Sequence, residues 1–320
     1  MPGKTSTRHA MRRSEGMQSA ITKMPARLDF KRNLKCAISL GVFVWTCAGD
    51  LFLQLFGKKH KGRCVVLYYH SIPPEERARF VDQLEILLRH AIPIVVGDRN
   101  QWEPGKQYAG VTFDDGFENF IDTALPEMAK RNIPSTVFII ADAVGKAFGP
   151  QGKSENVMSV EQIRSLPANL VTIGSHTSSH PFLPLLLGED SRREIVRSRS
   201  QIEEMIDRKV LLFSFPFGGY DQKLVSICRD AGYQRVFTTL PSFALDDPEE
   251  FVVGRVRVDP TDSPLEFRLK LAGAYRWLPH AFAMKRKLVS GRATRKVLDH
   301  ISTIDASGGR QSIIQDPGRR

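Results

Sequence analysis

The chain has 320 residues, of which 42% are hydrophobic and 25% are charged, as in an ordinary globular protein. Its net charge of +11 is concentrated at the two ends: residues 1–35 carry nine Lys or Arg against two acidic residues, and residues 281–320 carry nine against three. No aromatic residue interleaves with the basic ones in residues 1–29. This pattern argues against nucleic acid as a partner and predicts a disordered basic tail over residues 1–35.

The four cysteines show neither a disulfide framework nor a metal-binding spacing. Cys36, Cys47, Cys64 and Cys228 contain no CxxC pair, and four are few for a chain of this length. We therefore expect buried free thiols in a protein that does not depend on oxidation.

Residues 36–60 form a hydrophobic segment that precedes the main body of the chain. Residues 36–49 carry no charge, and the apolar run resumes after Asp50 and continues to Phe56. Fourteen uncharged residues are fewer than the roughly 20 of a spanning helix, and a longer span would bury Asp50 and Gln54 in lipid. The alternatives are a signal peptide, a helix packed on the domain, or a membrane-associated helix, which leaves localisation open between membrane-associated and cytoplasmic.

From Arg63 onward, short apolar runs alternate with helical stretches. Strands are predicted at residues 64–69, 109–113, 135–140, 170–173, 211–215, 235–238 and 251–256. Helices are predicted at residues 77–90, 119–131, 160–166, 190–208 and 221–231. This alternation is typical of a parallel sheet that is covered by helices on its faces.

About seven such strands favour an α/β fold, namely a single distorted (β/α) barrel spanning residues 61–280. After Val297 the apolar periodicity is lost, so residues 281–320 are expected to be a basic C-terminal tail. In barrels of this kind, chemistry takes place at the carboxyl ends of the strands. The polar residues at those ends are therefore the candidate site.

Two motifs lie at predicted strand ends. Asp114 and Asp115 follow the strand at residues 109–113, and His176 and His180 follow the strand at residues 170–173. Taken alone, the first motif is also typical of a turn that caps a helix, and the second of a solvated helical turn. Together, a carboxylate and two neutral imidazoles can hold a divalent metal and leave positions open for water and substrate.

These motifs resemble those of the polysaccharide deacetylase family, the NodB-homology or carbohydrate esterase 4 group, which includes chitooligosaccharide deacetylases. The resemblance rests on FDDG at Phe113–Gly116, SHTSSHP at residues 175–181 and FPFG at Phe215–Gly218, and it covers about residues 63–258. It implies that Asp115, His176 and His180 hold a metal, usually zinc. It also implies that Asp114 is the general base.

The third motif, Pro216, Phe217 and Gly218, is expected to bind substrate and the oxyanion, since family members use the amide that follows the proline. Two histidines are candidates for further roles. His70 follows the first strand and either faces the site or is a core histidine. His280, in Leu278-Pro279-His280, is the only literal match to the family's acid motif, but a proline within that motif argues against a central strand.

One position departs from the family pattern. Many members carry an arginine two residues before the third-motif proline, where it pairs with the base aspartate. Ser214 occupies that position here. The pKa of Asp114 must then be set by another residue.

The predicted function is a metal-dependent hydrolase that removes N-acetyl groups from N-acetylglucosamine-containing oligo- or polysaccharides. A metal-bound water would attack the acetamide, with Asp114 as base. The alternative is a carbohydrate-binding barrel that has lost turnover, because both the arginine and a convincing acid histidine are missing. A non-haem iron oxygenase is a third hypothesis, against which the second aspartate argues. The expected partners are a carbohydrate substrate and, through the N-terminal segment, a membrane surface.

Overall fold

The computed structural model describes residues 26–98, 102–150, 152, 154–247 and 249–284. The chain divides into two compact units, Met1–Arg276 and Trp277–Arg320. The described part of the second unit is residues 277–284, of which 278–284 are helical. All the predicted strands lie in the first unit.

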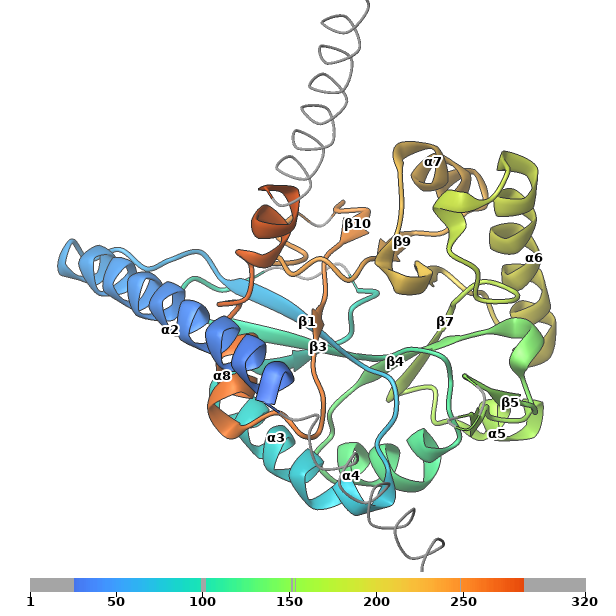
Figure 1. Ribbon diagram of the computed structural model, residues 1–320, viewed down its shortest axis with the longest axis horizontal. Helices are drawn as coiled ribbons and strands as arrows, with labels where there is room; N and C mark the ends of the chain where they lie inside the picture. The colour runs from blue at the N-terminus through green and yellow to red at the C-terminus, as the bar shows by residue number, and fades with distance from the viewer. Residues whose placement is uncertain (1–25, 99–101, 151, 153, 248, 285–320) are drawn as a thin grey trace, which may run out of the picture. The chain divides into compact units, whose positions relative to one another are not determined.

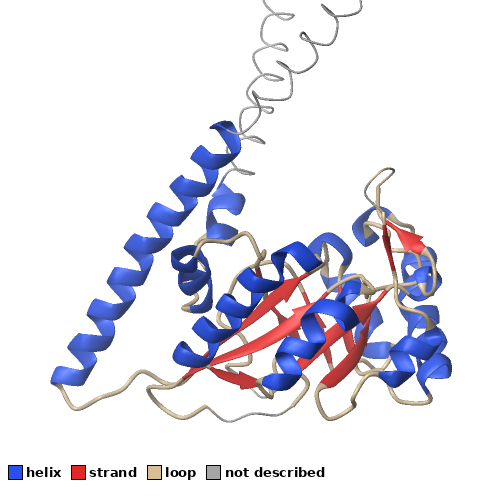
Figure 2. Ribbon diagram, turned by 90° about the horizontal axis from the view of Figure 1, so that it is seen from below, coloured by secondary structure: helices blue, strands red, loops and turns tan. Residues whose placement is uncertain are grey.

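The first unit is built on a curved parallel sheet with helices around it (Figures 1 and 2). Its strands are β1 (Arg63–Tyr69), β2 (Ile92–Ile94), β3 (Gln107–Phe113), β4 (Ser135–Ile139), β7 (Val171–Ser175), β8 (Leu212–Ser214), β9 (Arg235–Phe237), β10 (Val252–Val253) and β11 (Val256–Arg257). The strand order is β10-β9-β8-β7-β4-β3-β1-β11, with β2 paired to β3. A separate antiparallel pair is formed by β5 (Ala147–Phe148) and β6 (Glu155–Asn156).

The last two strands close the sheet. β10 pairs with β9 and β11 pairs with β1, so residues 252–257 join the two ends of the strand order. The predicted distorted (β/α) barrel is therefore confirmed, although the single strand predicted at residues 251–256 is divided at Gly254 and Arg255. A Cβ at Gly254 would lie 2.3 Å from the carbonyl oxygen of Leu240, so glycine alone fits this close approach.

The helices of the first unit follow most of the predicted ranges. They are α2 (Ala26–Leu55), α3 (Arg77–His90), α4 (Leu125–Lys130), α5 (Val160–Ser165), α6 (Gly188–Ile206), α7 (Gln222–Asp230) and α8 (Pro264–Leu271). The shorter turns are η1 (Pro74–Glu76), η2 (Phe120–Ala124), η3 (Ala141–Ala143), η4 (Leu183–Leu185) and η5 (Pro216–Gly218). The helix predicted at residues 119–131 is divided into the π-helical η2 and α4, because Pro126 in the first turn of α4 has no N–H to donate.

The N-terminal predictions need correction. The hydrophobic helix begins at Ala26, ten residues before the predicted start, so residues 26–35 are helical and not part of a disordered tail. Residues 1–25 and 285–320 lie outside the described residues, as do the tail predictions that fall on them. Cys64 and Cys228 are buried as expected, but Cys47 is exposed because α2 is covered on one side only.

Candidate active site

The carboxyl ends of β1, β3, β7 and β8 meet at one edge of the barrel and bring the predicted residues together. His70 follows β1, Asp114 and Asp115 follow β3, His176 follows β7, and Pro216 follows β8. They meet because all of these strands run parallel within one sheet.

Asp115, His176 and His180 form a compact cluster. The Nε2 atoms of His176 and His180 lie 3.6 Å and 3.5 Å from the Oδ1 atom of Asp115. This oxygen is buried and has no hydrogen-bond partner among the described residues. Ligand atoms about 2.0–2.1 Å from a tetrahedral zinc ion are roughly 3.3 Å apart, so the three side chains fit such an ion, which would also satisfy the buried oxygen.

The protonation states suit metal binding. Burial lowers the pKa of His176 to about 3 and also lowers the pKa of His180, so both imidazoles are neutral near pH 7. His176 Nδ1–H donates to the carbonyl oxygen of Ser214 at 2.7 Å, which leaves Nε2 free to bind a cation. Burial and the neighbouring Asp114 raise the pKa of Asp115 to about 7. A cation bound in the cluster would stabilise the ionised carboxylate of Asp115 and so lower this pKa.

Asp114 is held by Arg255, a residue that the sequence motifs did not identify. Arg255 lies between β10 and β11, is fully buried, and donates to both carboxylate oxygens of Asp114 at 2.7 and 2.8 Å. Its other N–H groups donate to the hydroxyls of Thr112 and Ser214 and to the carbonyl oxygen of Thr238. The guanidinium is therefore saturated, as a buried cation must be.

This ion pair fixes the charge of Asp114. Burial alone would raise the pKa of the carboxyl group, but the charge and hydrogen bonds of Arg255 outweigh it and hold the pKa at about 2. Asp114 is therefore ionised at neutral pH. The arginine that pairs with Asp114 is therefore Arg255. It comes from a different part of the chain than Ser214, but its side chain lies next to Ser214 in the fold.

Ser214 has a defined place in this arrangement. Its small hydroxyl accepts a hydrogen bond from Arg255 Nη2 at 2.7 Å, and its carbonyl oxygen orients His176. Both Ser214 and Arg255 are fully buried. An arginine side chain at position 214 would compete for the volume that the guanidinium of Arg255 fills.

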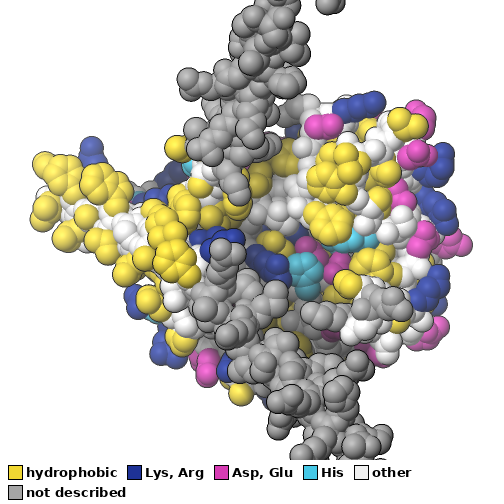
Figure 3. All heavy atoms as spheres, in the orientation of Figure 1, with side chains coloured by type: hydrophobic (Ala, Val, Ile, Leu, Met, Phe, Trp, Pro, Cys, Tyr) yellow, Lys and Arg dark blue, Asp and Glu magenta, His cyan; other side chains and the backbone are white. Residues whose placement is uncertain are grey.

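A pocket of about 850 Å³ opens over these residues. Figure 3 shows histidine and acidic side chains at this face, with hydrophobic side chains beside them. The pocket is lined by Asp114, Asp115, His176 and His180, by His70 and Tyr68, and by Phe117, Phe148, Glu155, Phe217, Thr239 and Arg257. A pocket of this size can hold a sugar unit or more.

The backbone at the site adopts left-handed conformations that are unusual for residues other than glycine. Asp115, Thr177, His180 and Phe217 have φ angles of 69°, 69°, 62° and 58°. Each such residue costs of order 1 kcal/mol, and they are four of the seven that occur among the described residues. The strain is concentrated where side chains must be aimed into the pocket.

The two uncertain histidines are placed differently. His70 lies in the pocket, and its pKa is lowered by burial although Asp114 acts in the opposite direction. His280 lies in the helical segment of the second compact unit and not at a strand end.

Sequence reasoning missed Arg255, Arg257 and Glu155. The sequence did contain an indication of Arg255. It is a charged residue within the β-prone run Phe251–Val258, and alternate side chains of such a strand point into the barrel. Glu155 lies in β6 and accepts hydrogen bonds from Ser71 and Asn119, both at 2.6 Å. Nothing in its local sequence indicated a place in the pocket.

The fold is a (β/α) barrel, and its site combines an Asp-His-His cluster with a second, buried carboxylate. Residues 102–236 match the polysaccharide deacetylase family. This match covers the central part of the barrel and agrees with the resemblance seen in the motifs.

Individual relatives agree with that family. YxkH of Bacillus subtilis, which is assigned to the polysaccharide deacetylases, is 27% identical over 173 residues, or 54% of this chain and 57% of YxkH. Chitin deacetylase 1 of Cryptococcus neoformans is 26% identical over 42% of this chain and 26% of its own length. The chain thus spans little more than half of one curated relative and a quarter of the other.

Solved structures share the barrel. IcaB from Ammonifex degensii is 28% identical, with a TM-score of 0.55 over 67% of this chain and 97% of IcaB. The deacetylase PplD of Streptococcus pyogenes has the same TM-score at 19% identity and shows the fold alone.

Proposed function

We propose that this protein removes N-acetyl groups from N-acetylglucosamine-containing oligo- or polysaccharides. The observation that carries the proposal is an ionised Asp114, held by Arg255, beside a buried Asp-His-His cluster at the mouth of a large pocket. The match to the polysaccharide deacetylase family and the similarity to a chitin deacetylase support the substrate class.

Asp115, His176 and His180 would hold a divalent cation, for which zinc fits the donor set and spacing. When bound, this cation supplies acidity to a coordinated water and polarisation of the acetamide carbonyl. The protein orients the cluster through the hydrogen bond from His176 to the Ser214 carbonyl.

Asp114 acts as the general base. Its carboxylate is ionised and fixed in one orientation by the two hydrogen bonds from Arg255, and it adjoins the metal cluster in sequence and in the pocket. It can therefore accept the proton of the attacking water without reorganising.

Phe217 supplies the candidate oxyanion donor. Its amide lies in η5 at the pocket wall, where the left-handed conformation of Phe217 is followed by Gly218. A Cβ at Gly218 would clash with Thr239, at 2.0 Å from its hydroxyl oxygen and 2.6 Å from its backbone nitrogen, so glycine is required in this tight turn. The Phe217 N–H would stabilise the negative charge that develops on the acetamide oxygen.

His70 is the candidate acid for the leaving amine. It lines the pocket, and burial keeps it neutral at rest. The proton that Asp114 takes from the attacking water would pass to the His70 imidazole, which lines the same pocket, and from there to the departing nitrogen.

Aromatic side chains at the mouth would contact the sugar. Phe217 is 66% exposed and contacts His180 in an edge-on arrangement, and Phe148 contacts the same imidazole edge-on. Glu155 and Arg257 provide polar groups in the same pocket for sugar hydroxyls.

The test is metal analysis of the purified full chain together with acetate release from chitooligosaccharides. We expect bound zinc and acetate release that Asp114→Asn abolishes while the metal content is kept. Acetate release that survives Asp114→Asn would contradict the mechanism. Glycan binding with metal bound but no acetate from the wild type would instead identify a carbohydrate-binding barrel without turnover.

A further inference from the structure

The helix α2 has no place in the proposed chemistry and is covered on one side only. Within its 26-residue segment Phe30–Leu55, the most apolar 18-residue stretch has a mean hydropathy of 1.8, and only 6% of that stretch is buried. A core helix of a soluble protein would be mostly buried, so this segment is apolar for another reason.

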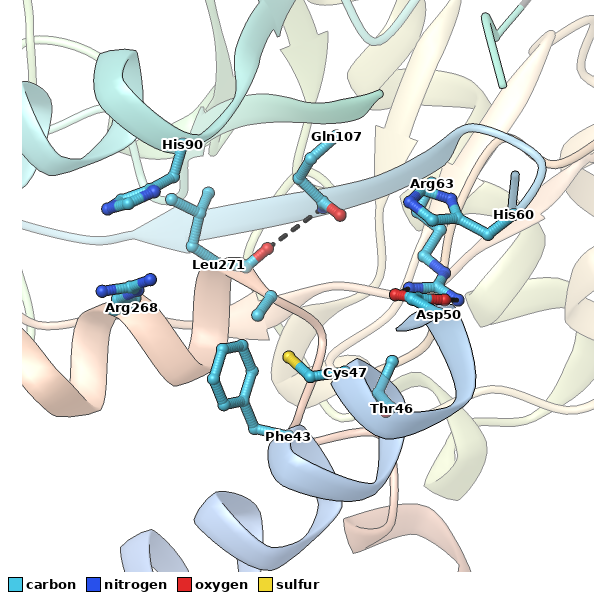
Figure 4. Close-up of a pocket in the computed structure, with 11 residues that line it drawn as sticks. Phe43, Thr46, Cys47, Asp50, His60, Arg63, His90, Gln107, Arg268 and Leu271 are labelled. Atoms are coloured by element: carbon cyan, nitrogen blue, oxygen red, sulfur yellow. Dashed lines mark hydrogen bonds and ion pairs between the residues drawn. The ribbon is translucent and has the colours of Figure 1, made fainter. Parts of the chain in front are cut away.

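One face of α2 is attached to the barrel through polar contacts. Arg32 Nε donates to Glu266 at 2.6 Å near the start of the helix, and Asp50 accepts two hydrogen bonds from Arg63 at 2.7 Å near its end. Between them Ser39 is fully buried, and Thr46 accepts a hydrogen bond from Arg276. We call this face, Arg32, Ser39, Thr46 and Asp50, the seam; Figure 4 shows its C-terminal part beside Arg63.

The seam has helical spacing. Its members are seven, seven and four residues apart, which places them on one side of an α-helix. Figure 4 shows Phe43 and Thr46 facing the cavity of about 180 Å³ that remains between α2 and the barrel. The contacts here are mainly ionic and polar, so the seam orients the helix without burying its apolar side.

The opposite face is apolar and exposed. Its large side chains are Phe30, Leu34, Ile38, Leu40, Val44, Trp45, Leu51, Phe52 and Leu55, each at least 40% exposed, and Trp45 is 80% exposed. Figure 3 shows this hydrophobic surface along the helix. No Asp, Glu, Lys or Arg interrupts this face between Cys36 and Gly49.

The two attachment points exclude a helix that crosses a bilayer while it stays bound to the barrel. Arg32 and Asp50 are 18 residues apart, or about 27 Å along the helix axis, which is nearly the roughly 30 Å thickness of the hydrocarbon layer. A spanning α2 would have to break both ion pairs or draw the barrel into lipid. A helix that lies in the plane of the membrane keeps both ion pairs and buries its apolar face.

The charges at both ends fit an anionic surface. Lys31 and Lys35 precede the apolar stretch and Lys58 and Lys59 follow it, and all four are exposed. We infer that α2 is an in-plane membrane helix, with its apolar face in a bilayer that contains anionic lipid and its seam bound to the barrel. This inference does not depend on the deacetylase activity.

The first test is the topology of the two helix ends. In a full chain carrying Cys36→Ser and Cys47→Ser, one exposed cysteine is introduced as Asn33→Cys or as Lys58→Cys, while Cys64 and Cys228 remain buried in the barrel. Labelling with a membrane-impermeant maleimide is compared in intact and inverted membrane vesicles. Both cysteines are expected to react from the same side; reaction from opposite sides would overturn the inference in favour of a spanning helix.

The second test is flotation of the full chain with phosphatidylcholine vesicles, with and without phosphatidylglycerol. Trp45→Glu and Phe52→Glu are each expected to weaken binding roughly tenfold or more, since each removes a large apolar side chain from lipid. Val196→Glu, a matched charge on the exposed side of α6, serves as the control and is expected to bind normally. Acetate release from soluble chitooligosaccharide should be unchanged in all three variants.

Two further results would overturn the inference. Equal flotation of the Trp45→Glu variant and the wild type would show that the apolar face does not enter lipid. An intact mass of the membrane-purified protein that lacks residues up to Leu55 would show that α2 is a processed signal segment.

Discussion

Arg255 and Asp114 lie on different strand ends and form a fully buried, two-point ion pair at 2.7 and 2.8 Å. The pair is possible because the last strand of the barrel is interrupted between β10 and β11, which directs the Arg255 side chain into the interior. Asp114 is therefore held by a residue 141 positions away in the sequence.

Replacing Arg255 should damage both stability and activity. Arg255→Gln leaves Asp114 buried without its cation, which is expected to cost about 3–5 kcal/mol of unfolding free energy. Denaturant unfolding and acetate release measure the two effects. Arg257→Gln, two residues further along and exposed, should change stability by no more than about 0.5 kcal/mol. An unchanged unfolding curve for Arg255→Gln would contradict the role of the pair.

Placing an arginine at position 214 tests whether an arginine there can replace Arg255 as the partner of Asp114. Because Ser214 and Arg255 share one buried site, Ser214→Arg alone should destabilise the protein by overpacking, by about 1–3 kcal/mol. The double variant Ser214→Arg with Arg255→Ser is expected to recover part of the stability and of the acetate release. A double variant no better than Arg255→Ser alone would show that the positions are not equivalent.

Zinc should stabilise the folded protein through Asp115, His176 and His180. Added zinc is expected to raise the Tm of metal-free wild type, since it binds the native cluster, and a chelator should reverse the shift. His176→Gln and His180→Gln should abolish the zinc-dependent shift. His90→Gln, at the end of α3, is the control that should keep it.

His70 and His280 can be separated as candidates for the acid. His70→Gln is expected to lower kcat by about 10²–10⁴ while zinc content and Tm stay close to those of the wild type. His280→Gln should leave kcat unchanged, because His280 lies in a helical segment of the second unit. A larger loss of kcat in His280→Gln than in His70→Gln would instead identify His280 as the acid.

Glu127 on α4 should make stability depend on pH. Hydrogen bonds from Arg77 and Lys130 lower the pKa of its carboxyl group from 4.5 to about 2, and Arg131 adds to them. Its stabilisation is therefore present above pH 4.5 and is lost as the pH falls toward 2. Glu127→Gln should lower the unfolding free energy by about 1–2 kcal/mol at pH 7, and the difference should shrink below pH 4.5. Glu75→Gln, at an exposed position of η1, should show no such difference.

Much of the barrel and its Asp-His-His cluster could be predicted from local patterns. The strand end at Asp114 and the His176–His180 spacing are short-range features, and parallel strand order brings them to one edge. Strand and helix ranges differ from the predictions mostly by one or two residues. The start of α2 was placed wrongly because the basic residues 26–35 read as a tail, whereas they continue the helix.

The sequence by itself determined the class of fold and the two motifs that contain Asp114, Asp115, His176 and His180, because each motif consists of residues close together along the chain. Only the tertiary structure decided which residue keeps Asp114 ionised and which side of α2 contacts the barrel. Arg255 reaches Asp114 only once β10 and β11 close the barrel, and α2 shows a polar and an apolar side only once Arg32 and Asp50 are paired. Both are contacts between distant segments, whose partners local periodicity does not specify.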